Sequence, residues 1–338
     1  MRTTSVDVIQ IPTKGPGDVS GLINLINKGM IAPASVLAIL GKTEGNGGVN
    51  DFTREYAVSA LSAALAPHVD LAPHKVEQKI AFVMSGGTEG VLSPHITVFA
   101  RSAVEGGNSA RPIAGKRLSI GIAQTRDFMP EEIGRTVQIE QTASAVRVAM
   151  RDAGIHDTKD VHFVQIKCPL LTSERIEAAH ARGRKTVTTS TYGSMGFSRG
   201  TSALGVASAL GEIDGPVRDE QILKDWKLFS SVASTSAGIE LMHNVVIVLG
   251  NSDSSASPFV IGHAVMRDAI DSAAVIGALE SVGLWARDRS DPIVPGRLVI
   301  FSPRPRRRRT AACADAATPC STIPISAPPG MPAPRSAD

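Results

Sequence analysis

The chain has 338 residues, of which 43% are hydrophobic and 20% are charged, as in an ordinary water-soluble protein. Its net charge of +3 and its 4% of aromatic residues argue against nucleic-acid binding and a sugar-binding cleft, and no window approaches the roughly 18 uninterrupted apolar residues of a membrane span. The three cysteines have no metal or redox spacing and the N-terminus has no apolar signal region, so we expect a cytoplasmic protein without disulfide bonds or a zinc site.

The first part of the chain alternates between predicted strands and helices. Apolar runs and turn residues predict, in order, a strand at 6–11, a short helix capped by Asp18 and ending near Lys28, a strand at 36–41 that ends before Lys42, a glycine-rich loop at 45–48, a helix at 52–65, a buried strand at 80–84 that leads to Ser85, and a strand at 95–100. Residues 105–112 have the composition of a linker. The first unit is therefore expected to end near residue 104.

Two further units are predicted after the linker. The second contains a strand at 118–123, a helix from Pro130 to about Asp152, a strand at 161–166 that presents Lys167, a helix at 197–210, Ser236, and a closing strand at 245–249. The third begins with a strand at 259–266, a helix at about 269–282 and a strand at 298–301. The periodic pattern then ends: residues 303–338 hold eight of the 21 prolines and a run of arginines at 306–309, which predicts a disordered tail.

Residues 197–210 are a second copy of residues 52–65. Each copy opens with an aromatic residue, a hydroxyl residue and an arginine, either Arg54 or Arg199, and continues with small and aliphatic residues. This pattern predicts a packed helix with the arginine at its N-terminal end. A lysine at the end of a strand precedes each copy, and a serine in the frame Ser-x-Gly-x-Glu follows it. The order lysine, arginine, serine therefore occurs twice, which indicates duplicated units that share a centre.

The lysine and the serine of one unit can act as a base and a nucleophile. A neutral lysine amine takes the proton of the serine hydroxyl while the oxygen attacks a carbonyl carbon. Because lysine normally carries a proton at neutral pH, this role requires burial and nearby cations, which Arg54 and Arg199 could supply. In the structural alternative, Lys42 and Lys167 are surface residues at strand ends and the serines lie in turns. The duplication favours the catalytic interpretation.

Other motifs in the chain are weaker. Residues 41–43 follow a strand as in a phosphate-binding loop, but Val36 stands where the first glycine is required, so nucleotide binding is not expected. Cys168 has no duplicated counterpart and is predicted to be a packing residue. Four histidines on strand-like segments are predicted to be core or surface residues rather than ligands, namely His95, His162, His243 and His263.

Longer motifs resemble one known family. The segments 41–47, 82–95, 164–171 and 236–240 are similar to those of the cyanuric acid hydrolase and barbiturase family, and the resemblance covers about residues 5–300. It implies an α/β fold in which three repeating units around a pseudo-threefold axis form a central β-barrel with outer helices, assembled as a homotetramer. The units implied are 1–104, 105–250 and an incomplete third unit at 251–302, followed by the atypical tail at 303–338.

The same resemblance implies a substrate and a mechanism. Cyanuric acid alternates three carbonyls with three ring N–H groups, and its ring-opening hydrolysis gives carboxybiuret. In the family pattern the second unit is the catalytic one, with Lys167 as the general base and Ser236 as the nucleophile. The repeated order of residues makes Lys42 and Ser85 the candidate for a second dyad. Backbone N–H donors stabilise the oxyanion by roughly 3 kcal/mol each in comparable sites. The implied substrate-binding residues are Arg54, Ser85, Gly86, Arg199, Ser236 and Ala237.

The tail departs from the family pattern. The family's third unit carries its own lysine, an arginine-bearing helix, a serine motif and a glycine-rich segment that holds a divalent metal, usually magnesium or calcium, whereas this chain has Pro303 and the arginine run. We hypothesise a shift of the reading frame near Ser302. We expect the metal site to be lost with the third unit, although the chemistry itself requires no cofactor.

Two alternative functions remain at this stage: a barbiturase, and a catalytically inactive binding or assembly protein.

Overall fold

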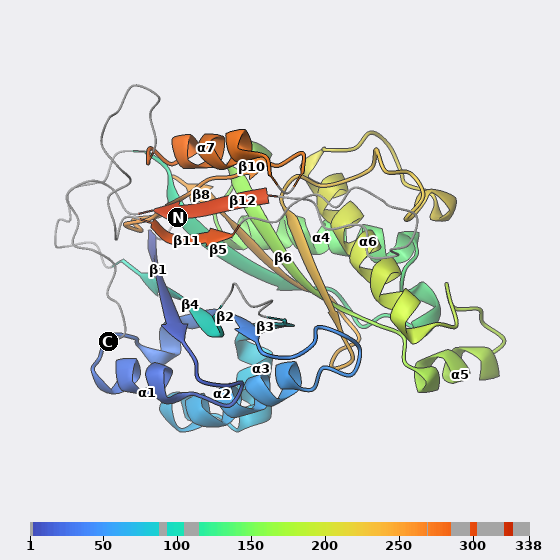
Figure 1. Cartoon of the computed structure of the whole chain (residues 1–338), viewed down its shortest axis with the longest axis horizontal. Helices are drawn as coiled ribbons and strands as arrows, with labels where there is room; N and C mark the ends of the chain where they lie inside the picture. Colours follow the sequence, from blue (N-terminus) through green and yellow to red (C-terminus); the bar gives the residue numbers. More distant parts are fainter. Residues whose placement is uncertain are drawn as a thin grey trace. The chain divides into compact units, whose positions relative to one another are not determined.

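The computed structural model describes residues 3–87, 93–104, 115–268, 270–284, 298–302 and 321–326 (Figure 1). Contacts between residues divide the chain into two compact units. The first unit consists of the chain up to Arg117 together with Asp253–Phe259, and the second contains Leu118–Ser252 and Val260–Ser326. The first unit includes the predicted first repeat, whereas the second unit includes most of the predicted second repeat together with most of the start of the predicted third.

The first unit is a four-stranded mixed sheet with helices beside it. Its elements are β1 (Thr4–Pro12), α1 (Ser20–Asn27), a 3₁₀ turn (Pro33–Ser35), β2 (Val36–Thr43), α2 (Thr53–Val69), α3 (Pro73–Lys79), β3 (Ala81–Gly86) and β4 (His95–Ala103). The strand order is β1-β4-β2-β3, in which β2 and β3 are parallel and the other neighbours are antiparallel.

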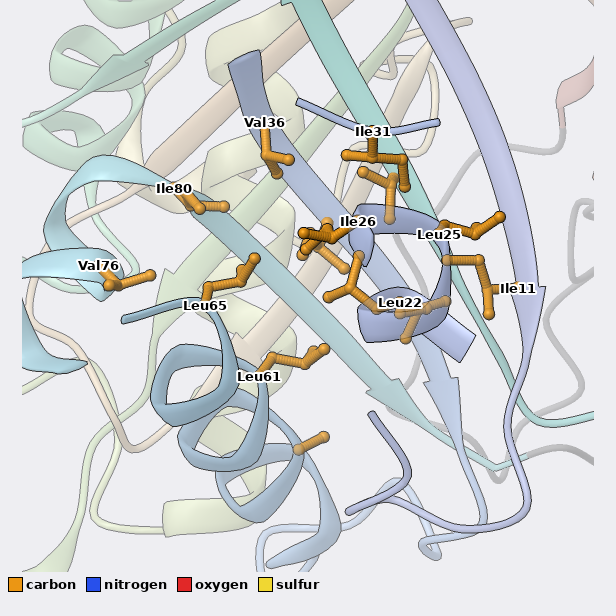
Figure 2. Packing of buried hydrophobic residues seen from close by; sticks show 14 of the residues in the cluster. Ile11, Leu22, Leu25, Ile26, Ile31, Val36, Leu61, Leu65, Val76 and Ile80 are labelled. Carbon is orange, nitrogen blue, oxygen red and sulfur yellow. The ribbon is translucent and has the colours of Figure 1, made fainter. Parts of the chain in front are cut away.

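The core of the first unit is formed by side chains of its helices and strands. Figure 2 shows Leu22 and Leu25 of α1, Leu61 and Leu65 of α2, and Val76 of α3 within one cluster of buried apolar side chains. Burying a side chain of this size contributes about 1.5–3 kcal/mol. The helices α2 and α3 are in contact with β3, so this packing holds the start of α2 near the strand that carries Ser85.

The second unit contains a sheet with the same strand order as the first. Its elements are β5 (Arg117–Gln124), a 3₁₀ turn (Pro130–Glu132), α4 (Thr136–Asp152), a 3₁₀ turn (Thr158–Asp160), β6 (Val161–Pro169), α5 (Ser173–Ala181), α6 (Thr191–Leu210), a 3₁₀ turn (Asp219–Gln221), β7 (Ala233–Gly238) and β8 (Val245–Ser252). The order is β5-β8-β6-β7, and β6 and β7 are parallel. Helices α4 and α6 pack against each other, α4 contacts β8, and α6 contacts β6 and β7.

A smaller sheet in the second unit contains a strand that the sequence pattern did not predict. The predicted strand at 259–266 is divided into β9 (Val260–Ile261) and β10 (Ala264–Val265), and these are followed by α7 (Ser272–Ser281) and β11 (Leu298–Ser302). Beyond them, β12 (Ser321–Ser326) pairs antiparallel with β9, β10 and β11. Hydrogen bonds to three neighbouring strands compensate for the weak apolar pattern of β12. The rest of the tail lies outside the described residues.

Three helices begin at other positions than predicted. The helix expected from Pro130 starts at Thr136, because Gly134 adopts a left-handed backbone with φ of +81° and separates it from the 3₁₀ turn. The helix expected from residue 197 starts at Thr191, where the Ser190 hydroxyl accepts a hydrogen bond from the Gly193 N–H. Asp18 accepts hydrogen bonds from Ser20 at the start of α1 but is not its N-cap residue.

The α/β class is confirmed, with mixed sheets. The described strands form three four-stranded sheets, and none of these is closed into a barrel, unlike the architecture that the family resemblance implied. No helix among the described residues is long and apolar enough to cross a membrane.

Candidate active site

The predicted lysine and serine of the second unit lie side by side at one end of the β6/β7 pair. Lys167 is paired with Ser236 in the parallel register, and Cys168 is paired with Ala237. Because paired residues of neighbouring strands project to the same face of a sheet, the amine and the hydroxyl share one side. The Lys167 side chain is only 2% exposed, and Ser236 is half-buried. The structure thus brings these two predicted site residues together.

Glu240 is a direct partner of Lys167 to which sequence reasoning assigned no role. Lys167 Nζ lies 2.7 Å from Glu240 Oε1 and forms an ion pair with this carboxylate. Lys167 Nζ makes no hydrogen bond to the Ser236 hydroxyl. The sequence did contain a signal for Glu240, because it is the last residue of the frame Ser-x-Gly-x-Glu. The glycine of this frame, Gly238, is required by the structure, because a Cβ there would overlap the Glu240 carboxylate. The glycine therefore leaves the space in which this carboxylate folds back toward the strand end.

Arg175 connects the two chain segments that leave β6 and β7. Its Nη1 donates to the Leu170 carbonyl and its Nη2 donates to the Ile239 carbonyl, both at 2.7 Å. The Thr172 hydroxyl caps α5 by accepting from the Arg175 N–H at 3.3 Å, which fixes the start of that helix. Burial lowers the pKa of Arg175, and the carboxylates of Glu240 and Glu174 oppose this change. The guanidinium thus holds the residue before Glu240 close to the end of β6.

The first unit shows the same lysine–serine register. Lys42 of β2 is paired with Ser85 of β3, and Thr43 is paired with Gly86. Lys42 Nζ donates a hydrogen bond to the Gly86 carbonyl at 3.1 Å. Lys42 and Ser85 are both half-buried, so this lysine is more accessible than its counterpart in β6. Glu89, which completes the serine frame, lies outside the described residues.

A buried carboxylate holds the loop around Arg54 in place. The Asp51 carboxylate accepts hydrogen bonds from the Gly47 N–H at 2.8 Å, from the Thr53 N–H at 3.1 Å and from the Thr53 hydroxyl. Burial raises the pKa of Asp51, but these hydrogen bonds and the charge of Arg54 outweigh it and hold the pKa below its usual value. A Cβ on Gly86 would overlap the same carboxylate, so Asp51 lies directly beside the end of β3.

Arg54 is positioned by this loop. It is the second residue of α2, as the repeat predicted, and is 6% exposed. Its Nη2 donates to the Gly48 carbonyl at 2.8 Å, and its Nε lies 3.9 Å from the Asp51 carboxylate. The loop carbonyl and the carboxylate thus fix the direction of the guanidinium. Sequence reasoning missed Asp51, although its place directly after a loop with three glycines at 45–48 was a signal.

Arg199 lies in the interior of α6 rather than at its N-terminal end, because the Ser190 cap starts that helix earlier. The arginine is half-buried. The neighbouring Ser198 and Ser202 accept hydrogen bonds from Gln138 Nε2 at 2.9 and 3.2 Å, and Asn244 Nδ2 donates to Ser202 at 3.0 Å. These buried side chains connect α6 to α4 and to the start of β8. They fix the rotation of α6 and thereby the face on which Arg199 lies.

Cys168 behaves as a packing residue, as predicted. The thiol is free and fully buried, and burial raises its pKa, although hydrogen bonds with Ser198 and Ser202 and the charges of Arg199 and Lys167 partly oppose this. Its Sγ lies 3.5 Å from the Ser236 carbonyl. A buried thiol with a raised pKa is a poor nucleophile.

The described residues provide no side-chain set for a metal. Among them, no three His, Cys, Asp or Glu side chains gather where they could hold an ion. The resemblance implied the family's metal in the third unit, and most of the corresponding residues here lie outside the described chain. The expected loss of that site therefore stays a prediction.

Comparison with known proteins shows the family to which the chain belongs. The model of the amidohydrolase ring-opening protein family matches residues 7–301, and the chain belongs to this family. The predicted resemblance and the predicted enzyme class are thus confirmed, and the match ends where the periodic pattern ends.

Individual relatives are similar over most of the chain. A cyanuric acid amidohydrolase of Bradyrhizobium diazoefficiens is 70% identical over 293 residues, which is 86% of this chain and 78% of the relative. A second cyanuric acid amidohydrolase, of Pseudomonas sp. strain ADP, is 58% identical over 86% of this chain and 79% of the relative. A solved cyanuric acid hydrolase, described as an evolutionary innovation by structural concatenation, has a TM-score of 0.82 at 56% identity and covers 88% of this chain and 80% of that chain.

Proposed function

We propose that this protein hydrolyses one ring amide of cyanuric acid and thereby opens the ring to carboxybiuret. The observation that carries the proposal is the direct pairing of a buried lysine with a serine, Lys167 with Ser236, at the end of two parallel strands. The names of relatives at 70% and 58% identity support the substrate. The repeated register of Lys42 with Ser85 supports a duplicated origin of the two units.

The proposed reaction begins at Ser236. The neutral amine of Lys167 takes the proton of the Ser236 hydroxyl as the oxygen bonds to a ring carbonyl carbon, and the carbonyl oxygen becomes an oxyanion. The backbone N–H of Ala237 and a guanidinium stabilise this charge, at roughly 3 kcal/mol per donor. The carbon–nitrogen bond then breaks, and the Lys167 ammonium returns the proton to the leaving ring nitrogen. Water releases carboxybiuret from the serine in a second step of the same kind.

The remaining predicted residues are assigned to substrate binding. Arg199 donates to a ring carbonyl, a task that suits a planar guanidinium held by a rigid helix. Arg54, Ser85 and Gly86 of the first unit keep the donor roles that the family resemblance implies. A threefold arrangement of repeating units and a homotetramer are part of the same proposal. The shared strand order of two described sheets supports the repeats.

The test is an assay of the purified protein with cyanuric acid and, in parallel, with barbituric acid. We expect loss of cyanuric acid and formation of carboxybiuret, and no turnover after Ser236→Ala. A second protein, in which residues 303–338 are replaced by the third-unit segment of a relative, is assayed beside it. Turnover of barbituric acid alone, or binding of cyanuric acid by calorimetry without turnover in both proteins, would overturn the proposal.

A further inference from the structure

The ion pair between Lys167 and Glu240 joins a buried amine to a carboxylate that reaches solvent. The Lys167 side chain is 2% exposed, whereas the Glu240 side chain is 26% exposed. We infer that Glu240 is the positioning and proton-relay residue of the catalytic lysine: it removes the proton of Lys167 to solvent before the chemical step. This inference rests on the proposed function, in which Lys167 acts as the base.

The need for such a relay follows from the chemistry of lysine. An amine carries its proton at neutral pH and can accept the Ser236 proton only after losing its own. Direct exchange with water is impeded because Lys167 is buried. Glu240 Oε1, at 2.7 Å from Nζ, is within proton-transfer distance of the amine, and the exposed part of the same carboxylate is accessible to water.

The proposed transfer moves one proton from Lys167 through Glu240 to water. The N–H bond of the Lys167 ammonium breaks, and an O–H bond forms on the Glu240 carboxylate. The Glu240 carboxyl then releases this proton to water, which leaves a neutral amine and a carboxylate. The amine next accepts the proton of the Ser236 hydroxyl while the serine oxygen bonds to the ring carbonyl carbon. No oxidant, reductant or further reactant is needed.

The surroundings of Glu240 hold it in this position. Arg175 donates hydrogen bonds to the carbonyl of Ile239, the residue before Glu240, and to the carbonyl of Leu170, which follows β6, so it ties the backbone beside Glu240 to the end of the lysine strand. Gly238 leaves the space that the carboxylate fills. Glu240 interacts electrostatically with two cations, Lys167 and Arg175. Two further charged groups lie close by: Glu174, which acts on Arg175, and Arg199, which acts on Cys168, the neighbour of Lys167.

The test compares Glu240→Gln, Glu240→Asp and Glu240→Ala with the parent protein. The glutamine can accept a hydrogen bond but cannot carry the proton, so we expect kcat to fall on the order of 10- to 100-fold with KM changed less than about threefold. Aspartate keeps a carboxylate and should retain more activity than glutamine. Glu131→Gln is the control, because it breaks an ion pair of equal length, 2.7 Å to Arg182, in the same unit.

Chemical rescue separates the relay from a structural role. Formate added to Glu240→Ala places a small carboxylate in the vacated space, and we expect kcat to rise several-fold and to saturate. Ser236→Ala should show no rescue. Turnover of Glu240→Gln within about twofold of the parent, or no rescue of a folded Glu240→Ala by formate, acetate or imidazole, would overturn the relay. If circular dichroism shows that Glu240→Ala is unfolded, the relay is tested by comparing the other two variants, of which Glu240→Asp should have the higher kcat and Glu240→Gln the lower. Absence of turnover both in the parent protein and in the protein with a relative's third-unit segment contradicts the proposed function instead.

Discussion

Lys167 and Ser236 occupy directly paired positions on the adjacent parallel strands β6 and β7. Neither residue is near the other in sequence, and the register of two strands is sufficient to place the amine and the hydroxyl on one face. The same register pairs Lys42 with Ser85 in the first unit. The unequal surroundings of the two lysines, with one nearly fully buried and the other half-buried, lead to the first prediction.

The two serines are expected to differ in their kinetic roles. Ser236→Ala removes the proposed nucleophile and should lower kcat by at least about 10³-fold. Ser85→Ala removes one hydrogen bond to the substrate, worth about 1 kcal/mol, and should raise KM several-fold with little change in kcat. Steady-state kinetics with cyanuric acid measures both. The assignment is wrong if Ser85→Ala is the inactive variant and Ser236→Ala the one with a raised KM.

A methyl group on Gly86 should disturb the Asp51 carboxylate. Its Cβ would overlap Asp51 Oδ2, so the buried carboxylate would lose hydrogen bonds to Gly47 and Thr53. We expect Gly86→Ala to lower the free energy of unfolding by about 2–4 kcal/mol. Urea denaturation measures this change. Gly15→Ala is the matched control in the same unit, because nothing lies within 4 Å of its Cβ; equal stabilities of the two variants would contradict the structure.

Two partly buried histidines should make the second unit sensitive to acid. Nδ1 of His162 lies 2.9 Å from Nδ1 of His263, so one donates and the other accepts when both are neutral. Burial, followed by the charge of His263, lowers the pKa of His162 to about 4, with Asp160 opposing; burial also lowers the pKa of His263, with Glu212 opposing. The pair is thus held in its neutral form at pH 7.

The sign of the pH dependence follows from these values. Between pH 6.5 and about 4 the unfolded state binds more protons at His162 than the folded state, so stability falls as the pH falls through this window and levels off below it. The loss is at most about 3 kcal/mol and is reduced by residual solvent exposure. Urea unfolding between pH 7 and pH 4.5 measures it. His162→Asn should flatten the curve, whereas replacement of the exposed His156 by Asn should not.

Cys168 should be dispensable for the chemistry. Its thiol is fully buried with a raised pKa, so it contributes packing rather than nucleophilic attack. We expect Cys168→Ala to keep kcat within about threefold and to lower stability by about 1 kcal/mol. A loss of kcat comparable to that of Ser236→Ala, in a variant that is folded by circular dichroism, would show that the thiol takes part in the reaction.

The tail should limit activity. Residues 303–338 lie beyond the match to the family and lack its third lysine and serine motifs. We expect the protein that carries a relative's third-unit segment to turn over cyanuric acid faster than the present chain and to be more soluble. Resequencing the gene near the codon of Ser302 in independent isolates tests the frame shift directly. An intact frame that encodes this tail in all of them refutes it.

Several features of the site could be predicted because they depend on neighbouring residues. Apolar runs define β2, β6 and β8, and the helical pattern after Phe52 correctly places Arg54 at the start of α2. The start of α6 was misplaced because it depends on a single capping hydroxyl, that of Ser190, several residues before the repeated motif. Strand β12 was missed because its six residues have a weak apolar pattern and obtain their stability from three partner strands.

The sequence by itself determined the alternation of strands and helices, the repeated order of lysine, arginine and serine, and the family, because these are patterns of adjacent residues. Only the tertiary structure decided that Glu240 contacts Lys167, that Asp51 supports Arg54 beside Gly86, and that His162 meets His263. These contacts depend on the direction in which a side chain leaves its loop or strand, and on the space that a glycine leaves open. A pattern of residue types carries little information about either.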